Sequence, residues 1–238
     1  MIIKDIELYV PKNRKLNWTF FHETRCIAFL YSRLLPKKLN GKEYKGIQIF
    51  CIKSMEHKEQ IDAYDPITFN YLPVYVETDV EAILVNPSDL EKKEHALDIV
   101  HSGMKLAAQE LGWDLTVFEE IYNTIKKTKY ENIYPLLKKS SPNRKYMCTI
   151  LCHHEVKSID VYLEIKKRNG DVINTEKLFS VENRLEQDLF SAYGSLVWKL
   201  NHKVEFADKD YKNVYRLTFL EKDKPEDLLW KIQKNGIS

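Results

Sequence analysis

Four potential zinc ligands lie close together in the sequence. They are Cys148, Cys152, His153 and His154, which offer the sulfur and nitrogen atoms that structural zinc sites use. If residues 146–154 form a strand, the two cysteines lie about 13 Å apart at ~3.3 Å per residue, whereas zinc holds each sulfur at about 2.3 Å. The two histidines would point to opposite faces. We therefore interpret the cysteines as core residues and expect no metal site and no cofactor.

A second string, Glu164-Ile165-Lys166, matches the Glu-x-Lys part of the metal-dependent nuclease signature. Asp160 falls on the same face of the expected strand, so carboxylates that hold Mg²⁺ beside a water-activating lysine are one chemistry to consider. The same string arises on any solvated strand face in a chain whose residues are 30% charged. The sequence favours such a face, and a nuclease-like enzyme stays an alternative.

Other catalytic motifs are missing from the sequence. His95 and His101 lie six positions apart, which puts them on different sides of a helix instead of in an i, i+4 ligand pair. The seven glycines are too scattered for a phosphate-binding loop. Ser140 and Ser141 fit an ordinary turn, and the basic residues form no dense stripe for nucleic acid. We expect a non-catalytic protein that does not bind nucleic acid.

The chain shows no signal for export or membrane insertion. Its first residues lack the basic start and long apolar run of a secretory signal, and no window approaches 18 consecutive apolar residues. The four cysteines are then expected to be reduced, as thiols are in the cytosol. These features predict a cytoplasmic protein that does not enter a membrane.

The net charge of +2 hides an uneven distribution along the chain. Residues 61–124 contain 3 basic and 13 acidic residues, whereas the segments before and after them are both basic. A solvated helix face with basic neighbours in the fold explains this pattern in one way. An acidic patch that steers a basic partner explains it in another.

The first part of the chain is expected to be rich in strands. Apolar patterns predict strands at residues 2–10, 47–52, 69–76 and 80–85, and a helix at residues 22–35 that Pro36 ends. Asn86-Pro87-Ser88-Asp89 then gives the clearest punctuation in the chain. We expect one domain of residues 1–238, with its best candidate boundary near Pro87, between residues 1–87 and 88–238.

A capped helical hairpin is expected next. Ser88 and Glu91 form a capping box, and an apolar stripe then runs from Leu97 to Leu111. Gly112 stands where a left-handed C-terminal cap belongs. A second helix, about residues 115–128, follows after three residues, so the two helices should pack antiparallel.

The rest of the chain alternates between apolar and polar residues, which is typical of antiparallel strands with one buried face. Asn169-Gly170 fits a type I′ hairpin turn. Lys224-Pro225-Glu226-Asp227 opens a short helix that Leu228, Leu229 and Ile232 would dock. These elements predict an α+β fold with antiparallel sheets flanking a central helical hairpin and a short C-terminal helix.

The hairpin also carries a family resemblance. It rests on Asp98-Ile99-Val100-His101-Ser102-Gly103, Ala107, Gly112-Trp113-Asp114, Phe118, Tyr122 and, downstream, Ser141-Pro142-Asn143-Arg144-Lys145. Over roughly residues 90–200 the chain resembles a bacterial family that looks like the immunity proteins of polymorphic or contact-dependent toxin systems. The resemblance implies a binding protein that covers a toxin's active site and has no catalytic residues. Immunity proteins against basic nucleases are often acidic overall, and only the central segment here has that character.

Packing alone also accounts for the same residues. Trp113 would lie under the hairpin turn, Gly103 would allow close helix approach, and Asp114 would cap the second helix.

We therefore expect an acidic surface on the hairpin to form part of the site for a basic protein toxin. Its candidate residues are Glu91, Glu94, Asp98, Glu110, Asp114, Glu119 and Glu120. The first three share one helix face, where like charges cost a few tenths of a kcal/mol per pair. The alternatives are the nuclease-like enzyme and a ligand-binding or scaffold protein on which this face is simply solvated.

Overall fold

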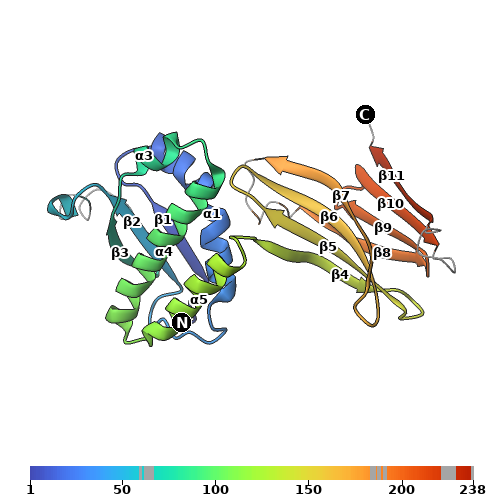
Figure 1. The fold of residues 1–238 in the computed structure, drawn as a ribbon, viewed down its shortest axis with the longest axis horizontal. Helices are drawn as coiled ribbons and strands as arrows, with labels where there is room; N and C mark the ends of the chain where they lie inside the picture. Colours follow the sequence, from blue (N-terminus) through green and yellow to red (C-terminus); the bar gives the residue numbers. More distant parts are fainter. Residues whose placement is uncertain are drawn as a thin grey trace. The chain divides into compact units, whose positions relative to one another are not determined.

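The computed structural model describes residues 1–58, 61, 67–182, 186, 189, 192–220 and 229–236. The chain divides into two units, Met1–Asn132 and Ile133–Ser238 (Figure 1). Pro87, the expected boundary, lies between two helices within unit 1. None of the helices in the described part of the chain is long and apolar enough to cross a membrane.

Unit 1 is built on a parallel sheet. Its elements are β1 (Asp5–Tyr9), α1 (Arg14–Leu34), β2 (Gly46–Ile52), η1 (Met55–His57), β3 (Tyr71–Glu77), α3 (Val80–Val85), α4 (Asp89–Leu111) and α5 (Leu115–Lys127). The strands lie in the order β1-β2-β3 and all run the same way. The expectation of antiparallel strands before the hairpin is therefore wrong. Helix α1 returns the chain between β1 and β2, which is the crossover that parallel neighbours need.

Two other local predictions in unit 1 change. Residues 80–85, expected as a strand, form α3, because the Asp79 carboxylate accepts the Ala82 N–H at 3.1 Å and caps a helix there. The first helix starts at Arg14 instead of His22, because Asn13 caps it by accepting the Leu16 N–H at 3.0 Å.

The main helices of unit 1 pack on one face of its sheet. Helix α1 lies against β1, and α4 lies against β2 and β3 (Figure 1). Gly103 of α4 faces Ile49 of β2 so closely that a Cβ on the glycine would lie 2.5 Å from Cδ1 of Ile49. Gly103 thus allows α4 to approach the sheet closely. The sequence predicted a close approach between helices at this residue instead.

The helical hairpin forms as predicted. Only half of the expected capping box forms: the Ser88 hydroxyl accepts the Glu91 N–H at 3.2 Å, but the Ser88 N–H donates to the Asn86 side chain at 2.9 Å instead of to the Glu91 carboxylate. Gly112 takes the left-handed conformation with φ 74°, as predicted. Asp114 accepts the Thr116 N–H at 3.0 Å and begins α5. The Trp113 ring lies 5.7 Å from that of Phe118, under the turn between the helices.

Unit 2 is a pair of antiparallel meanders. Its strands are β4 (Ile133–Ser140), β5 (Tyr146–His154), β6 (Ser158–Lys167), β7 (Val172–Glu182), β8 (Tyr193–Leu200), β9 (Lys203–Asp208), β10 (Asn213–Leu220) and β11 (Leu229–Gly236). They form two four-stranded sheets, β4-β5-β6-β7 and β11-β10-β9-β8. The prediction of antiparallel sheets is confirmed for this half of the chain.

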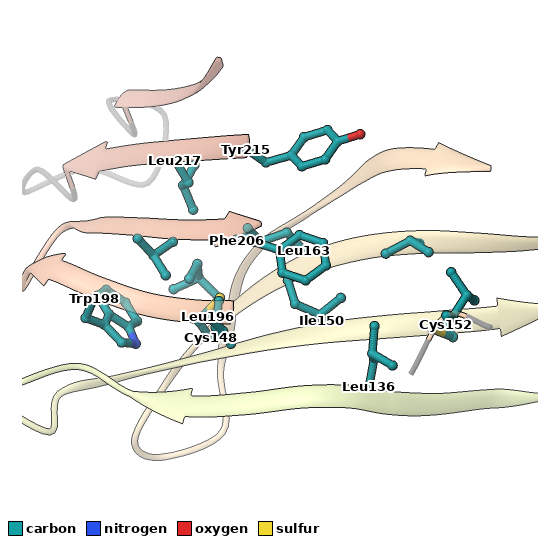
Figure 2. Close-up of a cluster of buried hydrophobic side chains, with 14 of the residues drawn as sticks. Leu136, Cys148, Ile150, Cys152, Leu163, Leu196, Trp198, Phe206, Tyr215 and Leu217 are labelled. Atoms are coloured by element: carbon teal, nitrogen blue, oxygen red, sulfur yellow. The ribbon is translucent and has the colours of Figure 1, made fainter. Parts of the chain in front are cut away.

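Both sheets of unit 2 contribute to one hydrophobic core. Cys148, Ile150 and Leu163 come from the first sheet, and Phe206 and Leu217 come from the second (Figure 2). The predicted alternation holds on β6, with one exception. Glu164 belongs to the polar face but is only 8% exposed.

Two predictions in unit 2 are wrong. Leu229 and Ile232 of the expected C-terminal helix lie in β11, where β10 offers backbone partners; residues 224–228 lie outside the described residues. The β6–β7 turn is not type I′, because Gly170 has φ 101° but Asn169 does not have a positive φ. The Lys167 N–H instead donates to the Asp171 carbonyl at 2.8 Å, which closes a longer loop with glycine in its left-handed position.

All four cysteines lie in described cores, with Cys26 and Cys51 in unit 1 and Cys148 and Cys152 in unit 2. They are buried and not joined in disulfides. Burial raises the pKa of the Cys51 and Cys148 thiols well above the usual range.

Candidate interaction surface on helices α4 and α5

Three acidic residues follow one another along the exposed side of α4. Glu91, Glu94 and Asp98 are all exposed and occupy successive turns of the helix. At ~1.5 Å per residue they span about 10 Å. We call these three residues the acidic ridge.

The side chains of the basic residues next to the ridge in the sequence are buried. Lys92 and Lys93 are 5% and 9% exposed, so their side chains turn inwards. The ammonium of Lys92 pairs with the carboxylate of Glu23 on α1 at 2.5 Å. The outer surface of this part of α4 is therefore acidic.

Asp98 is held in place by a tyrosine of α5. The Tyr122 hydroxyl donates to the Asp98 carboxylate at 2.8 Å. This hydrogen bond is the main cause that raises the pKa of Tyr122 to about 12. The Lys126 ammonium lies over the Tyr122 ring, 5.1 Å from its centre, so one cation borders the ridge on the α5 side.

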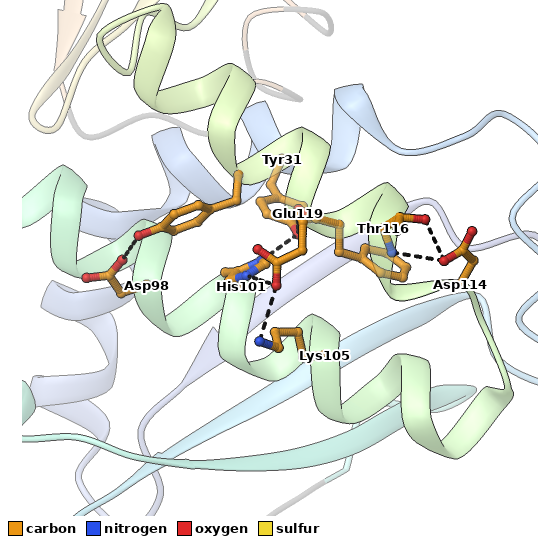
Figure 3. Close-up of polar contacts among 9 residues, drawn as sticks. Tyr31, Asp98, His101, Lys105, Asp114, Thr116 and Glu119 are labelled. Atoms are coloured by element: carbon orange, nitrogen blue, oxygen red, sulfur yellow. Dashed lines mark hydrogen bonds and ion pairs between the residues drawn. The ribbon is translucent and has the colours of Figure 1, made fainter.

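His101 joins three helices beneath this surface (Figure 3). Its Nδ1 lies 3.4 Å from the hydroxyl of Tyr31 on α1, and its Nε2 lies 3.3 Å from the carboxylate of Glu119 on α5. The same carboxylate pairs with the Lys105 ammonium at 3.2 Å.

The electrostatics of this network follow from burial and from pairing. Burial lowers the pKa of His101, and the Glu119 carboxylate partly opposes that effect. The hydrogen bond with Lys105 is the main cause that lowers the pKa of Glu119. A neutral His101 donates its Nε2–H to Glu119, and its Nδ1 then shares the single Tyr31 hydroxyl proton with the Phe118 carbonyl, which lies 3.3 Å from the Tyr31 oxygen. Both ring nitrogens are thus engaged within the fold, and the network acts as a polar link between helices.

The structure divides the predicted acidic residues into groups. The charge of Glu119 is paired with that of Lys105, and its carboxylate also accepts from His101, although Glu119 lies close enough to the ridge to affect the pKa of Tyr122. Asp114 caps α5, and its bond with the Thr116 hydroxyl lowers its pKa. Glu110 and Glu120 are exposed on α4 and α5, and no contact of theirs ties them to the ridge.

The cysteine and histidine cluster does not converge. Cys148 and Cys152 face the core of unit 2, while His153 stacks on Tyr162 at 4.2 Å on the opposite face of the sheet. His154 is buried, with Nδ1 3.0 Å from a Glu186 carboxylate oxygen. Across the described ranges, no three side chains of His, Cys, Asp or Glu are grouped so that they could hold a metal ion.

The Glu-x-Lys string pairs within itself. Lys166 lies 2.9 Å from Glu164, and Asp160 pairs with Lys177 of β7 at 2.7 Å. Asp160 also accepts a hydrogen bond from the Ser180 hydroxyl at 2.7 Å. Each charge of the string is therefore opposed by a neighbour on the same sheet.

Sequence reasoning missed the residues that organise the ridge. In the sequence, Tyr122 is named only within the family resemblance, and no role is given to Tyr31 or to Lys105, which contact His101 and Glu119 beside the ridge. A signal existed only for Tyr122, since a tyrosine at the edge of an apolar stripe often directs its hydroxyl to a polar partner.

Comparison with known proteins gives no match: no family model, curated protein or solved structure is similar to this chain.

Proposed function

We propose that this chain is a non-catalytic binding protein of the immunity type, which neutralises a bacterial toxin by covering it. The acidic ridge would form part of the site for a basic surface of that toxin. The observation that carries this proposal is the exposure of Glu91, Glu94 and Asp98 in a row while Lys92 and Lys93 are buried.

A row of like charges is retained here at a cost. Carboxylates at i, i+3 and i+4 on a helix repel one another by a few tenths of a kcal/mol. The contacts described for Glu91 are with its own helix cap and with Asn86, neither of which is a cation. A positively charged partner would remove this repulsion and would be steered to the ridge over a distance of about one Debye length, ~8–10 Å.

Contacts within the hairpin leave fewer acidic residues available to a partner than the sequence predicts. Asp114 and Glu119 already have partners within the hairpin, so binding a toxin would require them to exchange those partners. The Asp98–Tyr122 pair adds an aromatic hydroxyl beside the ridge, and tyrosine is frequent at protein interfaces. We therefore assign Glu91, Glu94 and Asp98 as the residues that recognise the partner.

Gene neighbourhood gives a first test. A toxin gene immediately upstream favours the immunity function, whereas a metabolic operon favours a ligand-binding or scaffold protein. The decisive experiment then co-expresses the chain with that toxin domain and measures rescue of growth, co-purification and affinity.

Charge reversal tests the ridge itself. The variant Glu91→Lys, Glu94→Lys, Asp98→Lys should lose rescue and weaken binding by about 100-fold or more, because like charges facing each other across an interface cost several kcal/mol. The matched control is Glu43→Lys, Glu56→Lys, Glu131→Lys, which changes the net charge equally at exposed positions outside the predicted acidic surface. Rescue that survives ridge reversal with unchanged affinity and salt dependence would show that the ridge is merely solvated.

A further inference from the structure

A basic cluster forms at one end of the first sheet of unit 2, where two hairpins meet. The β4–β5 turn and the β6–β7 turn are joined by the Arg168 N–H, which donates to the Lys145 carbonyl at 2.9 Å. Register explains the meeting, because Met147 of β5 pairs with Ser140 of β4 on one side and with Lys166 of β6 on the other.

The basic cluster surrounds a pocket of about 360 Å³. Another pocket, of about 380 Å³, lies in unit 1, but its charged residues are of both signs. The pocket of the basic cluster is lined by Lys138, Ser140, Arg144, Tyr146, Met147, Lys166, Lys167, Arg168 and Gly170. Five of these residues are cations and none is acidic. The carboxylate of Glu164 lies 2.9 Å from the Lys166 ammonium and offsets its charge.

Protection of a sheet edge does not explain this cluster. Lysines on an edge strand prevent pairing with other chains, and β4 is the edge strand of its sheet. That role would account for Lys138. It does not account for Lys166 and Lys167, which belong to β6, an inner strand between β5 and β7.

Arg144 lies in the β4–β5 turn with a positive φ, as six other non-glycine residues of the described chain do. Arg144 has φ 58°, in the left-handed region that a residue with a Cβ enters at a cost of roughly 1–2 kcal/mol. Glycine would satisfy the turn without that cost. The guanidinium of Arg144 lines the pocket with four other cations, so its charge adds to their mutual repulsion.

We propose that this pocket binds a compact phosphate-bearing ligand. Phosphate offers several charged acceptor oxygens, which arginine engages in pairs and lysine engages as a point charge. The Ser140 hydroxyl, which donates weakly to the Met147 sulfur at 3.8 Å, also lines the pocket and would add a neutral donor on turning to the ligand. The volume falls within the ~300–1,000 Å³ of small-molecule sites.

The extent of the cluster favours a small ligand over a nucleic-acid strand. On the face of β6 that carries Lys166, the next residues away from the pocket are Glu164, Tyr162 and Asp160. Acidic side chains therefore come directly after the basic end of the strand. A strand of nucleic acid needs a basic track along its backbone. On this face of β6, no cation follows Lys166 in the direction of Asp160.

Calorimetric titration of the full chain with inorganic tripolyphosphate tests the proposal. Binding is expected to weaken by about 10-fold in Arg168→Ala and in Lys138→Ala, since each removes a charged hydrogen-bond donor at a partly solvated site. The matched control is Lys203→Ala, which removes an exposed lysine of β9 outside the pocket and should leave binding unchanged.

Arg144→Gly separates loss of binding from loss of folding. It should weaken tripolyphosphate binding, yet it should not lower the melting temperature, because glycine adopts this turn conformation freely. Absence of binding at millimolar tripolyphosphate, or equal binding by all pocket variants, overturns the proposal.

Two further titrations identify competing ligands. A glutamate-rich peptide that binds where tripolyphosphate does not would overturn the phosphate assignment. A single-stranded oligonucleotide that binds about 100-fold more tightly than tripolyphosphate would overturn the preference for a compact ligand. The pocket belongs to unit 2 and the acidic ridge to unit 1, so either proposal can fail without the other.

Discussion

Filling the side-chain position of Gly103 tests how closely α4 lies against the parallel sheet. A Cβ at this residue would lie 2.5 Å from Cδ1 and 2.7 Å from Cγ1 of Ile49. Carbon atoms pack at about 3.5–4.0 Å. Ile49 is fully buried in the central strand, so it has little room to move aside.

Two opposing effects set the magnitude of the change. Alanine in place of glycine within a helix stabilises by about 0.5–1 kcal/mol. An extra carbon forced into a packed core destabilises by about 1–3 kcal/mol. The clash involves the branched, stiff part of isoleucine as well as its tip, so we expect a cost in the upper part of that range. Gly103→Ala should therefore lower the free energy of unfolding of unit 1 by about 1–2 kcal/mol net.

Urea unfolding followed by far-UV circular dichroism measures this change, because α1, α4 and α5 all belong to unit 1. Ser102→Ala is the matched control, since Ser102 is exposed one residue earlier in the same helix and alanine there should stabilise by a few tenths of a kcal/mol. Ile49→Ala should cost about 1 kcal/mol less in the Gly103→Ala background, because the new methyl group fills part of the cavity. If Gly103→Ala stabilises the protein as it would in an exposed helix, the close approach of α4 to β2 is refuted.

Two further predictions concern titration where α4 meets α5. Glu119→Gln removes the carboxylate that opposes the effect of burial, so the pKa of His101 should fall further below its ordinary value, as measured by imidazole NMR; a rise would contradict the assigned contact. The stability that neutral His101 contributes is present above the ordinary histidine pKa and is lost as the pH falls through the lowered value, and this loss should be larger in Glu119→Gln. Asp98→Asn should lower the pKa of Tyr122 from about 12, as measured by NMR of ring-labelled tyrosine, whereas Glu94→Gln should shift it less. An unchanged pKa in Asp98→Asn would mean that the hydroxyl is not bonded to Asp98.

The sequence predicted features that depend on neighbouring residues alone. Ser88 with Glu91, Gly112 and Asp114 each set a backbone conformation within a few positions of themselves, and the hairpin they define forms as expected. The acidic ridge was predictable for the same reason, because helical spacing alone puts Glu91 near Asp98 on one face.

Features that depend on distant pairing were not predictable. The apolar run of β2 fits a parallel strand as well as an antiparallel one, and the direction is set by the return of the chain through α1. At residues 80–85 the preference of Val80 and Ile83 for strands is outweighed by the Asp79 cap. The basic pocket needs Lys138 and Arg168 together, and only the register of three strands, β4, β5 and β6, joins them.

The four cysteines are natural probes of local unfolding in this molecule. Two thiols lie inside each unit. An alkylating reagent reacts with a buried cysteine only when its sulfur reaches solvent and forms a thiolate. The rate of alkylation at Cys26 and Cys51 would therefore report the opening of the core of unit 1. The rate at Cys148 and Cys152 would report the opening of the core of unit 2. The peptides that contain these cysteines differ in mass, so the opening of each unit can be followed separately without an added cysteine.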